Sequence, residues 1–147
     1  PPRSTHCISS AASDVYKRQR DGLKTRLETS TVFIQVADTA PDTVSPPCAI
    51  VLPGSPVVEY HQAFGNGLER FSFTILVLAQ RFDVKANQDL IDGMVSGSSS
   101  VRALIEGDRT LGGNCSDCQV TSASTYGDVS VNETEYLGIE FEVEVYA

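Results

Sequence analysis

Two cysteines at the spacing C-x-x-C, Cys115 and Cys118, are the first residues of this sequence that could carry chemistry. Such a pair can act as a redox dithiol or supply half of a zinc site. A structural zinc site needs four ligands, and after residue 19 only Cys48 and His61 could join the pair, at no recognisable spacing. A thioredoxin-like pair opens a helix after a strand, whereas this pair follows Gly112-Gly113 and precedes a predicted strand. We therefore expect incidental thiols, or a small structural disulfide in an oxidising compartment.

Residues for acid–base or nucleophilic catalysis are sparse. His61 is the only histidine after residue 19, and a lone histidine in a strand more often packs or faces solvent than acts as a general base. The serines of "GSP" (54–56) and "GSSS" (97–100) lack the G-x-S-x-G turn that exposes a nucleophile. The sequence therefore predicts no catalytic residue, and we expect the protein not to be an enzyme.

Motifs for binding small ligands are equally weak. The stretch "GNGLER" (65–70) has neither the third glycine nor the strand-to-helix setting of a dinucleotide loop, and a hairpin explains it better. Asp83, Asp89 and Asp92 are too dispersed for a calcium loop and predict a solvated helix face. We therefore predict no cofactor-binding residue, no metal-binding residue and no cofactor.

Three glutamates, Glu140, Glu142 and Glu144, alternate with apolar residues in the stretch "EYLGIEFEVEVYA" (135–147). This period of two is typical of a half-buried β-strand. The core-facing set predicted by the alternation is Ile139, Phe141, Val143 and Val145. The glutamates are then expected on the open face of a sheet, where a solvated surface is the simplest interpretation.

The composition is that of a soluble globular domain. The chain has 147 residues, 41% of them hydrophobic, and a formal net charge of -8. It contains no repeat period and no run of about 18 apolar residues, so neither a solenoid nor a membrane span is predicted. Because an acidic surface repels phosphate, a protein that grips DNA is not expected.

Residues 1–19 are expected to be foreign to the protein. The stretch "SAASDVYKRQ" (10–19) resembles translated sequencing-adapter read-through, which is found at the ends of metagenomic reading frames. The chain starts at Pro1, and its only methionine is Met94. We interpret residues 1–19 as a non-native, disordered or artefactual segment and residues 20–147 as a single domain; a native polar N-terminal arm is the alternative.

The first half of this domain alternates between strand and loop signals. Asp21–Glu28 could end a longer helix, because Leu23 and Leu27 share one face. Predicted next are a strand over Thr31–Val36, a loop over Ala37–Pro47, and a short strand over Cys48–Leu52 that the following "PGSP" stops.

A hairpin is predicted around Gly65-Asn66-Gly67, with arms Val57–Phe64 and Leu68–Gln80. The second arm becomes apolar on both faces, so we expect it in the centre of the sheet.

Two short amphipathic helices follow the hairpin. The first spans Val84–Val95, with Asp83 as its N-cap, and the second is capped by Ser99 or Ser100. The apolar stripe predicted for the first helix is Leu90, Ile91, Met94 and Val95.

After a turn-rich connection over Gly107–Cys118, strands Gln119–Val131 and Thr134–Ala147 meet near Asn132-Glu133. The element order predicts an α+β fold: a mainly antiparallel β-sheet with two or three short helices packed on one face.

Three runs resemble the tail terminator proteins of long-tailed bacteriophages, also called tail completion or minor tail proteins. They are "PPCAIVLPGSPVVEYHQAFGNGLERFSFTILVLAQR" (46–81), "SSVRALIEGDRTLGG" (99–113) and "VTSASTYGDVSVNETEYLGIEFEVEVYA" (120–147). Each run alone has a pattern that many α+β proteins share. Their order is more specific to this family, and the resemblance covers nearly all of residues 20–147. The chain departs from the family at its N-terminus, and Cys115 and Cys118 match no motif of that family.

The resemblance implies a non-enzymatic virion assembly protein without a cofactor. Family members form a ring, generally a hexamer, that caps the tail tube, ends tube polymerisation and presents the surface that joins the head connector. The implied partners are copies of the same chain, the tail tube protein and head connector proteins, with no membrane. The implied location is the head-proximal end of the virion tail, after assembly in the bacterial host cytoplasm.

Two alternative functions remain open on the sequence. A head-tail connector or neck protein shares the size and fold style of a terminator. A small C-x-x-C thiol-redox or metal-binding protein belongs to a different class and would depend on Cys115 and Cys118.

If the domain forms a ring, the glutamates acquire a sharper interpretation. Glu140, Glu142 and Glu144 would then lie at the lumen or at a subunit interface, and a negative lumen would let DNA pass without specific binding.

Overall fold

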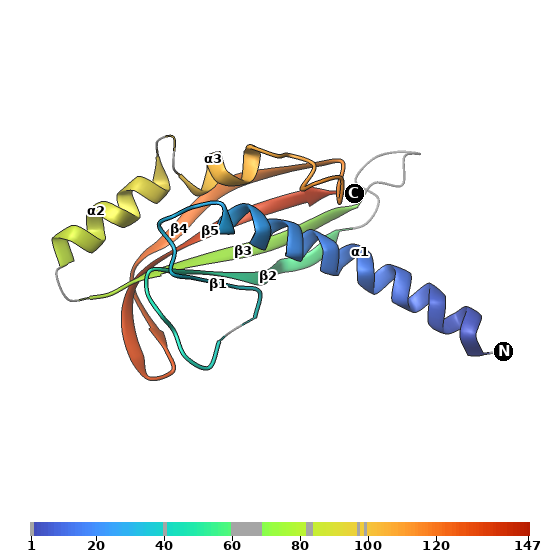
Figure 1. Ribbon diagram of the computed structural model, residues 1–147, viewed down its shortest axis with the longest axis horizontal. Coiled ribbons are helices and arrows are strands. Elements are labelled where there is room, and N and C mark those ends of the chain that lie inside the picture. Colours follow the sequence, from blue (N-terminus) through green and yellow to red (C-terminus); the bar gives the residue numbers. More distant parts are fainter. Residues whose placement is uncertain (1, 40, 60–68, 82–83, 97, 99) are drawn as a thin grey trace.

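The computed structural model of the protein (Figure 1) describes residues 2–39, 41–59, 69–81, 84–96, 98 and 100–147, with side chains from Val15 onward except that of Val84. The elements in chain order are α1 (Pro2–Glu28), β1 (Gln35–Ala37), β2 (Cys48–Glu59), β3 (Arg70–Ala79), α2 (Val84–Val95), α3 (Val101–Glu106), β4 (Asp117–Val131) and β5 (Thr134–Tyr146).

Within these residues the strands form one five-stranded sheet in the order β1-β2-β3-β5-β4. β1 pairs with β2 in parallel, and the other neighbouring strands pair antiparallel. The predicted α+β class with a mainly antiparallel sheet is therefore confirmed. The predicted central position of the apolar hairpin arm is also confirmed, because β3 lies between β2 and β5.

The helices pack on one face of the sheet, which we call the helix-covered face (Figure 1). Amphipathic spacing gives each helix a pair of buried apolar residues there. These pairs are Leu23 and Leu27 of α1, Ile91 and Met94 of α2, and Val101 and Ile105 of α3. They meet the apolar set of β5 and the buried Phe73 and Ile75 of β3, so this face carries the main core.

Local signals placed the later elements correctly. α2 spans Val84–Val95 as predicted, and the N-cap of α3 is Ser100, whose Oγ accepts a hydrogen bond from the N–H of Ala103 at 3.2 Å. Asn132 and Glu133 both have positive φ, the geometry of a type I′ turn, and they join β4 to β5 as predicted. Asp83, Ser99 and the Gly65–Gly67 turn lie outside the described residues.

The predicted stop of a strand at "PGSP" is wrong, because β2 continues through it to Glu59. The register with β3 shifts between Pro53 and Val58, so the extra residues form a bulge. β1 pairs with β2 only as far as Ile50, which leaves the later part of β2 at an edge where proline costs no ladder hydrogen bond. Gly54 is required at this bulge, since a Cβ would lie 2.7 Å from the backbone of Ser72.

The predicted strand over Thr31–Val36 is also wrong in its bounds. Only Gln35–Ala37 pair with β2, while Val32 and the buried Phe33 pack against the main core. The chain leaving α1 is first held in a turn, where the N–H of Val32 donates to Ser30 Oγ at 3.2 Å. Val32 and Phe33 are therefore used for packing before strand pairing begins, whereas Ile34 stays exposed.

The helix predicted to end at Glu28 does so, and it continues upstream through residues 2–19. The ring of Tyr16 stacks on Phe73 with centroids 5.1 Å apart. Gln19 is fully buried, yet neither atom of its amide has a hydrogen-bond partner within the described part of the chain. The foreign origin of this segment stays a prediction.

Candidate functional site

The three glutamates lie on the face of the sheet opposite the helices, which we call the helix-free face. Their strand, β5, is paired on both sides, and Glu140, Glu142 and Glu144 lie across from Leu76, Thr74 and Ser72 of β3. Their neighbours on β4 are Ser124, Ser122 and Gln119. The predicted alternation is confirmed, since Ile139, Phe141, Val143 and Val145 are buried in the main core.

Hydrogen bonds hold two of the three carboxylates in place. The phenol of Tyr146 donates to Glu144 at 2.8 Å, and Arg70 Nη1 lies 3.5 Å from the same carboxylate. Arg70 also forms an ion pair with Glu59 of β2. Thr74 Oγ1 donates to Glu142 at 3.3 Å.

All three glutamates lie on the open face and are half-buried rather than fully exposed. The side chain of Glu144 is 24% exposed. β3 supplies Arg70 beside Glu144 and Thr74 beside Glu142, and no pattern within 135–147 could reveal these partners. Glu140 has no ion pair within the described residues, so the row is only partly neutralised, at its Glu144 end.

The other end of the helix-free face is apolar. Cys48 and Ile50 of β2 cluster there with Leu76 and Leu78 of β3. The tip of the β4–β5 hairpin lies over this end, and its Asn132 Nδ2 donates to the carbonyls of Pro41 and Asp42 at 3.1 and 3.0 Å. This face thus combines a covered apolar end with an acidic end that no described helix covers.

The C-x-x-C pair lies in and after the connection between α3 and β4. Both thiols are free, with Cys118 buried and Cys115 half-buried. Burial raises the pKa of Cys115 to about 11 and that of Cys118 to about 12. The thiolate is the nucleophilic form of cysteine, so burial makes both thiols less reactive than exposed ones. Within the described residues no group of three or more His, Cys, Asp or Glu side chains could hold a metal ion.

The connection is closed by one strong ion pair. Arg109 donates to both carboxylate oxygens of Asp117, at 2.6 and 3.0 Å. This bidentate contact lowers the pKa of Asp117 below its usual value. The connection is therefore an ordered surface element rather than a loose loop.

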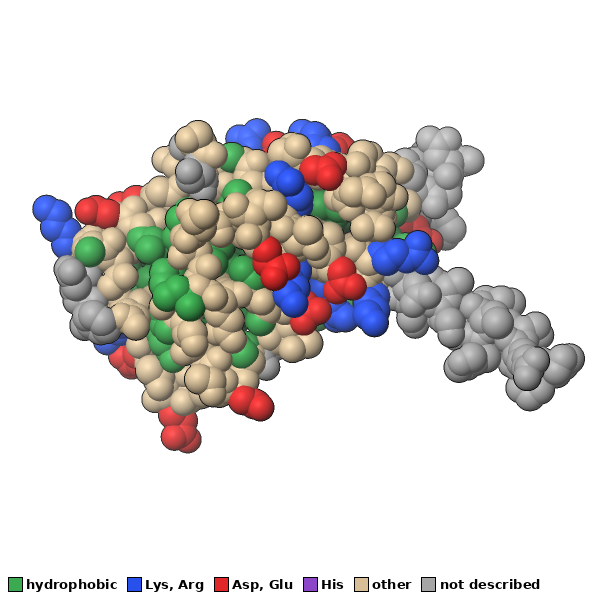
Figure 2. Space-filling view, in the orientation of Figure 1, with side chains coloured by type: hydrophobic (Ala, Val, Ile, Leu, Met, Phe, Trp, Pro, Cys, Tyr) green, Lys and Arg blue, Asp and Glu red, His purple; other side chains and the backbone are tan. Residues whose placement is uncertain are grey.

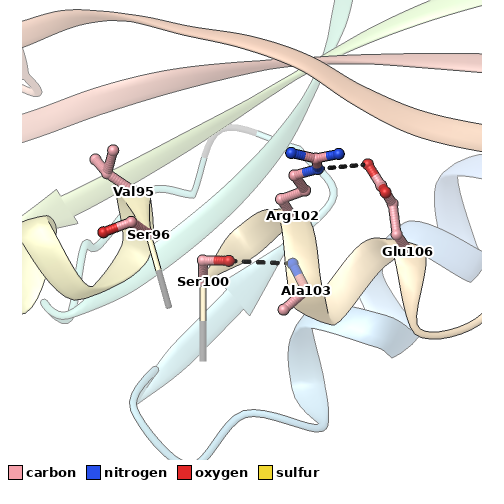
Figure 3. A pocket seen from close by; sticks show the side chains of 6 residues that line it. All are labelled: Val95, Ser96, Ser100, Arg102, Ala103 and Glu106. Atoms are coloured by element: carbon pink, nitrogen blue, oxygen red, sulfur yellow. Dashed lines mark hydrogen bonds and ion pairs between the residues drawn. The ribbon is translucent and has the colours of Figure 1, made fainter. Parts of the chain in front are cut away.

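A groove that sequence reasoning missed lies between the helices and the β4 edge of the sheet. One part, of about 360 Å³, is lined by Val95, Ser96, Ser100, Arg102, Ala103 and Glu106 (Figure 3). A second part, of about 260 Å³, shares Val95 and Arg102 and adds Val120–Ala123 and Phe141. In Figure 3 Arg102 and Glu106 point from α3 toward β4, and they are joined by an ion pair at 3.3 Å. We call this hollow the β4 groove.

Val95 was predicted in the apolar stripe of its helix, and this is wrong. Ile91 and Met94 are buried, whereas Val95 is 46% exposed and lines the β4 groove. Val95 is the last residue of α2, and it lies beside α3 and β4 at the groove rather than in the main core. No local signal could have found the groove, since it joins residues from four separate elements.

The surface on the helix-covered side is not uniform. Figure 2 shows acidic and basic side chains mixed over the C-terminal half of α1, and hydrophobic side chains gathered between α2 and the connection from α1 to β1. Ile34 of this connection is 72% exposed. Among the described helices, none is long and apolar enough to cross a membrane.

Comparison with known protein families finds no family model that matches the chain, and comparison with curated proteins finds no match. The function must therefore be inferred from the residues and their arrangement.

Proposed function

We propose that this protein is a non-enzymatic virion assembly protein that forms a ring, generally a hexamer, on the end of a phage tail tube. The ring ends tube polymerisation and offers the surface that head connector proteins join. Its place is the head-proximal end of the virion tail, and DNA passes through it without specific binding. The ordered resemblance to tail terminators, which covers nearly all of residues 20–147, motivates the proposal.

The single observation that carries it is the acidic row on the helix-free face. Like charges at neighbouring positions of a sheet destabilise the fold, and among the described residues only the Glu144 end of this row is paired with a cation. A row of carboxylates fixed on a central, doubly paired strand repels phosphate, and its rigidity keeps that repulsion in one place. Such a surface suits the wall of a channel through which DNA must slide.

The proposal is tested on the whole chain by light scattering after size-exclusion chromatography, with negative-stain imaging and a tail-tube binding assay. The expected result is a closed ring that binds tube ends and stops their growth. A monomer at every concentration tested, without binding to tubes, would overturn the proposal.

The acidic row is tested by the triple variant Glu140→Gln, Glu142→Gln and Glu144→Gln, which removes charge with little change in size. The expected result is an intact ring that retains DNA, seen as slowed DNA passage or as new DNA binding at low salt. The control removes three exposed acidic charges elsewhere, with Glu28→Gln, Asp89→Asn and Glu133→Gln. Equal DNA binding by both variants would show that total charge, not the acidic row, matters.

A further inference from the structure

Ile34 presents an apolar side chain without cover at the β1 edge of the sheet. Its side chain is 72% exposed, more than any other large apolar side chain that the structure describes. Its backbone is fixed, because the N–H of Ile34 donates to the carbonyl of Pro47 at 2.8 Å. This hydrogen bond fixes the backbone that carries the exposed side chain, so burying Ile34 in a contact would cost little ordering entropy.

The β4 groove offers an apolar seat at the opposite edge. Its second part has Val120, Ala123 and Phe141 along the strands and the half-exposed Val95 at the helix end. A cavity of about 150 Å³ is known to hold a benzene ring, so the 260 Å³ of this part can hold an isoleucine side chain.

The charges around these two features are complementary. Between Arg26 and Arg70 the chain has no lysine or arginine, so the segment that carries Ile34 is acidic, with Asp38 and Asp42 close by in sequence. At the groove, Arg102 is 71% exposed on the rim. Glu106, the acid of the groove, is already held by Arg102, by Arg109 and by the N–H of Val120.

We propose that the Ile34 side chain of one copy seats in the β4 groove of the next copy, with Arg102 facing the acidic segment. This inference rests on the proposed ring and names the contact that builds it. β1 and β4 are the two edges of the sheet, so the contact joins unlike surfaces. A contact between unlike surfaces repeats from copy to copy and closes into a ring when its rotation allows.

Side-chain docking is favoured over addition of a strand to β4. The outward N–H of Val120 is already bonded to Glu106 Oε2 at 3.1 Å. β4 also carries two register shifts, between Val120 and Ser122 and between Ser124 and Gly127. Bulges and occupied donors interrupt the regular ladder that a new strand would need.

The experiment uses two full-length variants, Ile34→Asp and Val95→Asp, at positions where the exposed side chain leaves the fold intact. Each removes one apolar partner and places a carboxylate against the other surface. Alone, each is expected to dissociate into monomers, with the association weakened at least about 30-fold, as for an anchor residue. Mixed in equal amounts, they are expected to form a dimer that cannot grow, because one intact Ile34 meets one intact groove. Mass photometry measures both results.

The control is Val57→Asp, which changes another exposed apolar residue, 43% exposed, on β2. It is expected to assemble like the unchanged protein. If the unchanged protein forms rings and both test variants do so equally well, the contact is wrong and the ring proposal stands. If the unchanged protein is a monomer, both proposals fail. Two monomeric variants that do not dimerise when mixed, or only one variant that dissociates, would show that Ile34 and the groove do not meet.

A charge exchange tests the orientation of the contact. Arg102→Glu is expected to weaken association by about 10-fold at low salt, and Asp38→Lys in the same chain is expected to restore part of this loss. Restoration that is equally strong with Asp89→Lys, on α2, would show a general charge effect and overturn this orientation.

Discussion

The two faces of the sheet use the same strands for different purposes. On β3, Ile75 points into the helix-covered face and is fully buried, whereas its neighbour Leu76 points into a small cluster on the helix-free face. On β5, Val143 is buried among helices, while Glu142 beside it is held by a threonine hydroxyl. Because the two sets alternate along each strand, one face can supply the stability while the other carries charge.

The largest expected effect tests this division of stability. Phe73→Ala removes a fully buried ring from the helix-covered face and is expected to cost about 3–5 kcal/mol of unfolding free energy. Leu76→Ala, on the helix-free face, is expected to cost about 2–3 kcal/mol, since its smaller cluster collapses more easily. Urea denaturation measures both. Equal losses would show that the two faces contribute equally to stability.

A second, opposite effect concerns Gln19, which is fully buried and has no hydrogen-bond partner among the described residues for either amide atom. A buried unpaired amide costs stability, so Gln19→Leu is expected to raise the unfolding free energy by about 1–2 kcal/mol. Lys24→Leu, on the same helix, is the control for added helical hydrophobicity and should change stability by less than about 0.5 kcal/mol. If Gln19→Leu lowers the unfolding free energy instead, the amide of Gln19 is not a buried, unpaired group that costs stability.

Gln19 also bears on the origin of its segment. Between Val15 and Glu28, where the side chains of α1 are described, the other large buried residues are Leu23 and Leu27, and the same face reaches Gln19 one turn earlier. A foreign origin of residues 1–19, which stays a prediction, would account for a polar residue at this buried position.

Much of the fold was predictable because its signals are local. The bounds of α2, the cap at Ser100, the turn at Asn132-Glu133 and the alternation of β5 each depend on residues within one or two turns. The continuation of β2 through "PGSP" was not predictable, since it depends on how far β1 extends along it. The same holds for β1, whose start depends on how the chain leaves α1.

The candidate site divides in the same way. Period two placed Glu140, Glu142 and Glu144 on one face, but the partners of Glu142 and Glu144, Thr74 and Arg70, come from another strand. The β4 groove was invisible because Val95, Val120 and Phe141 are brought together only by the fold. Sequence pattern thus predicts which face a residue takes, and tertiary contacts decide its environment there.

A third prediction compares the two ends of the acidic row. Glu144→Gln weakens the contacts with Arg70 and Tyr146 and is expected to lower the unfolding free energy by about 0.5–1 kcal/mol. Glu140→Gln removes only the repulsion between Glu140 and its neighbours, and it is expected to raise the unfolding free energy by about 0–0.5 kcal/mol. Urea denaturation at low and high salt measures both, and the difference should shrink with salt. If the unfolding free energy changes with the same sign and size in both variants, the row behaves as uniform solvated charge.

The smallest expected effect is pH-dependent and compares one tyrosine on each face. Burial raises the pKa of Tyr146 on the helix-free face, with a further rise from its hydrogen bond to Glu144. Burial also raises the pKa of Tyr16 on the helix-covered face, against a lowering by Arg20. Above pH 10 the unfolded chain loses these phenol protons while the folded chain keeps them, so the unfolding free energy falls as pH rises.

Replacing either tyrosine by phenylalanine removes one such proton and should make this fall shallower. When Glu144 is also replaced by Gln, Tyr146→Phe is expected to change the pH slope less, because the carboxylate that raises the phenol pKa is gone. The change of slope caused by Tyr16→Phe should stay the same. Urea midpoints between pH 8 and pH 11 measure the slopes. If Glu144→Gln changes both tyrosine effects equally, the two faces are electrostatically coupled through the sheet, and the division between a stabilising face and a charged face does not hold.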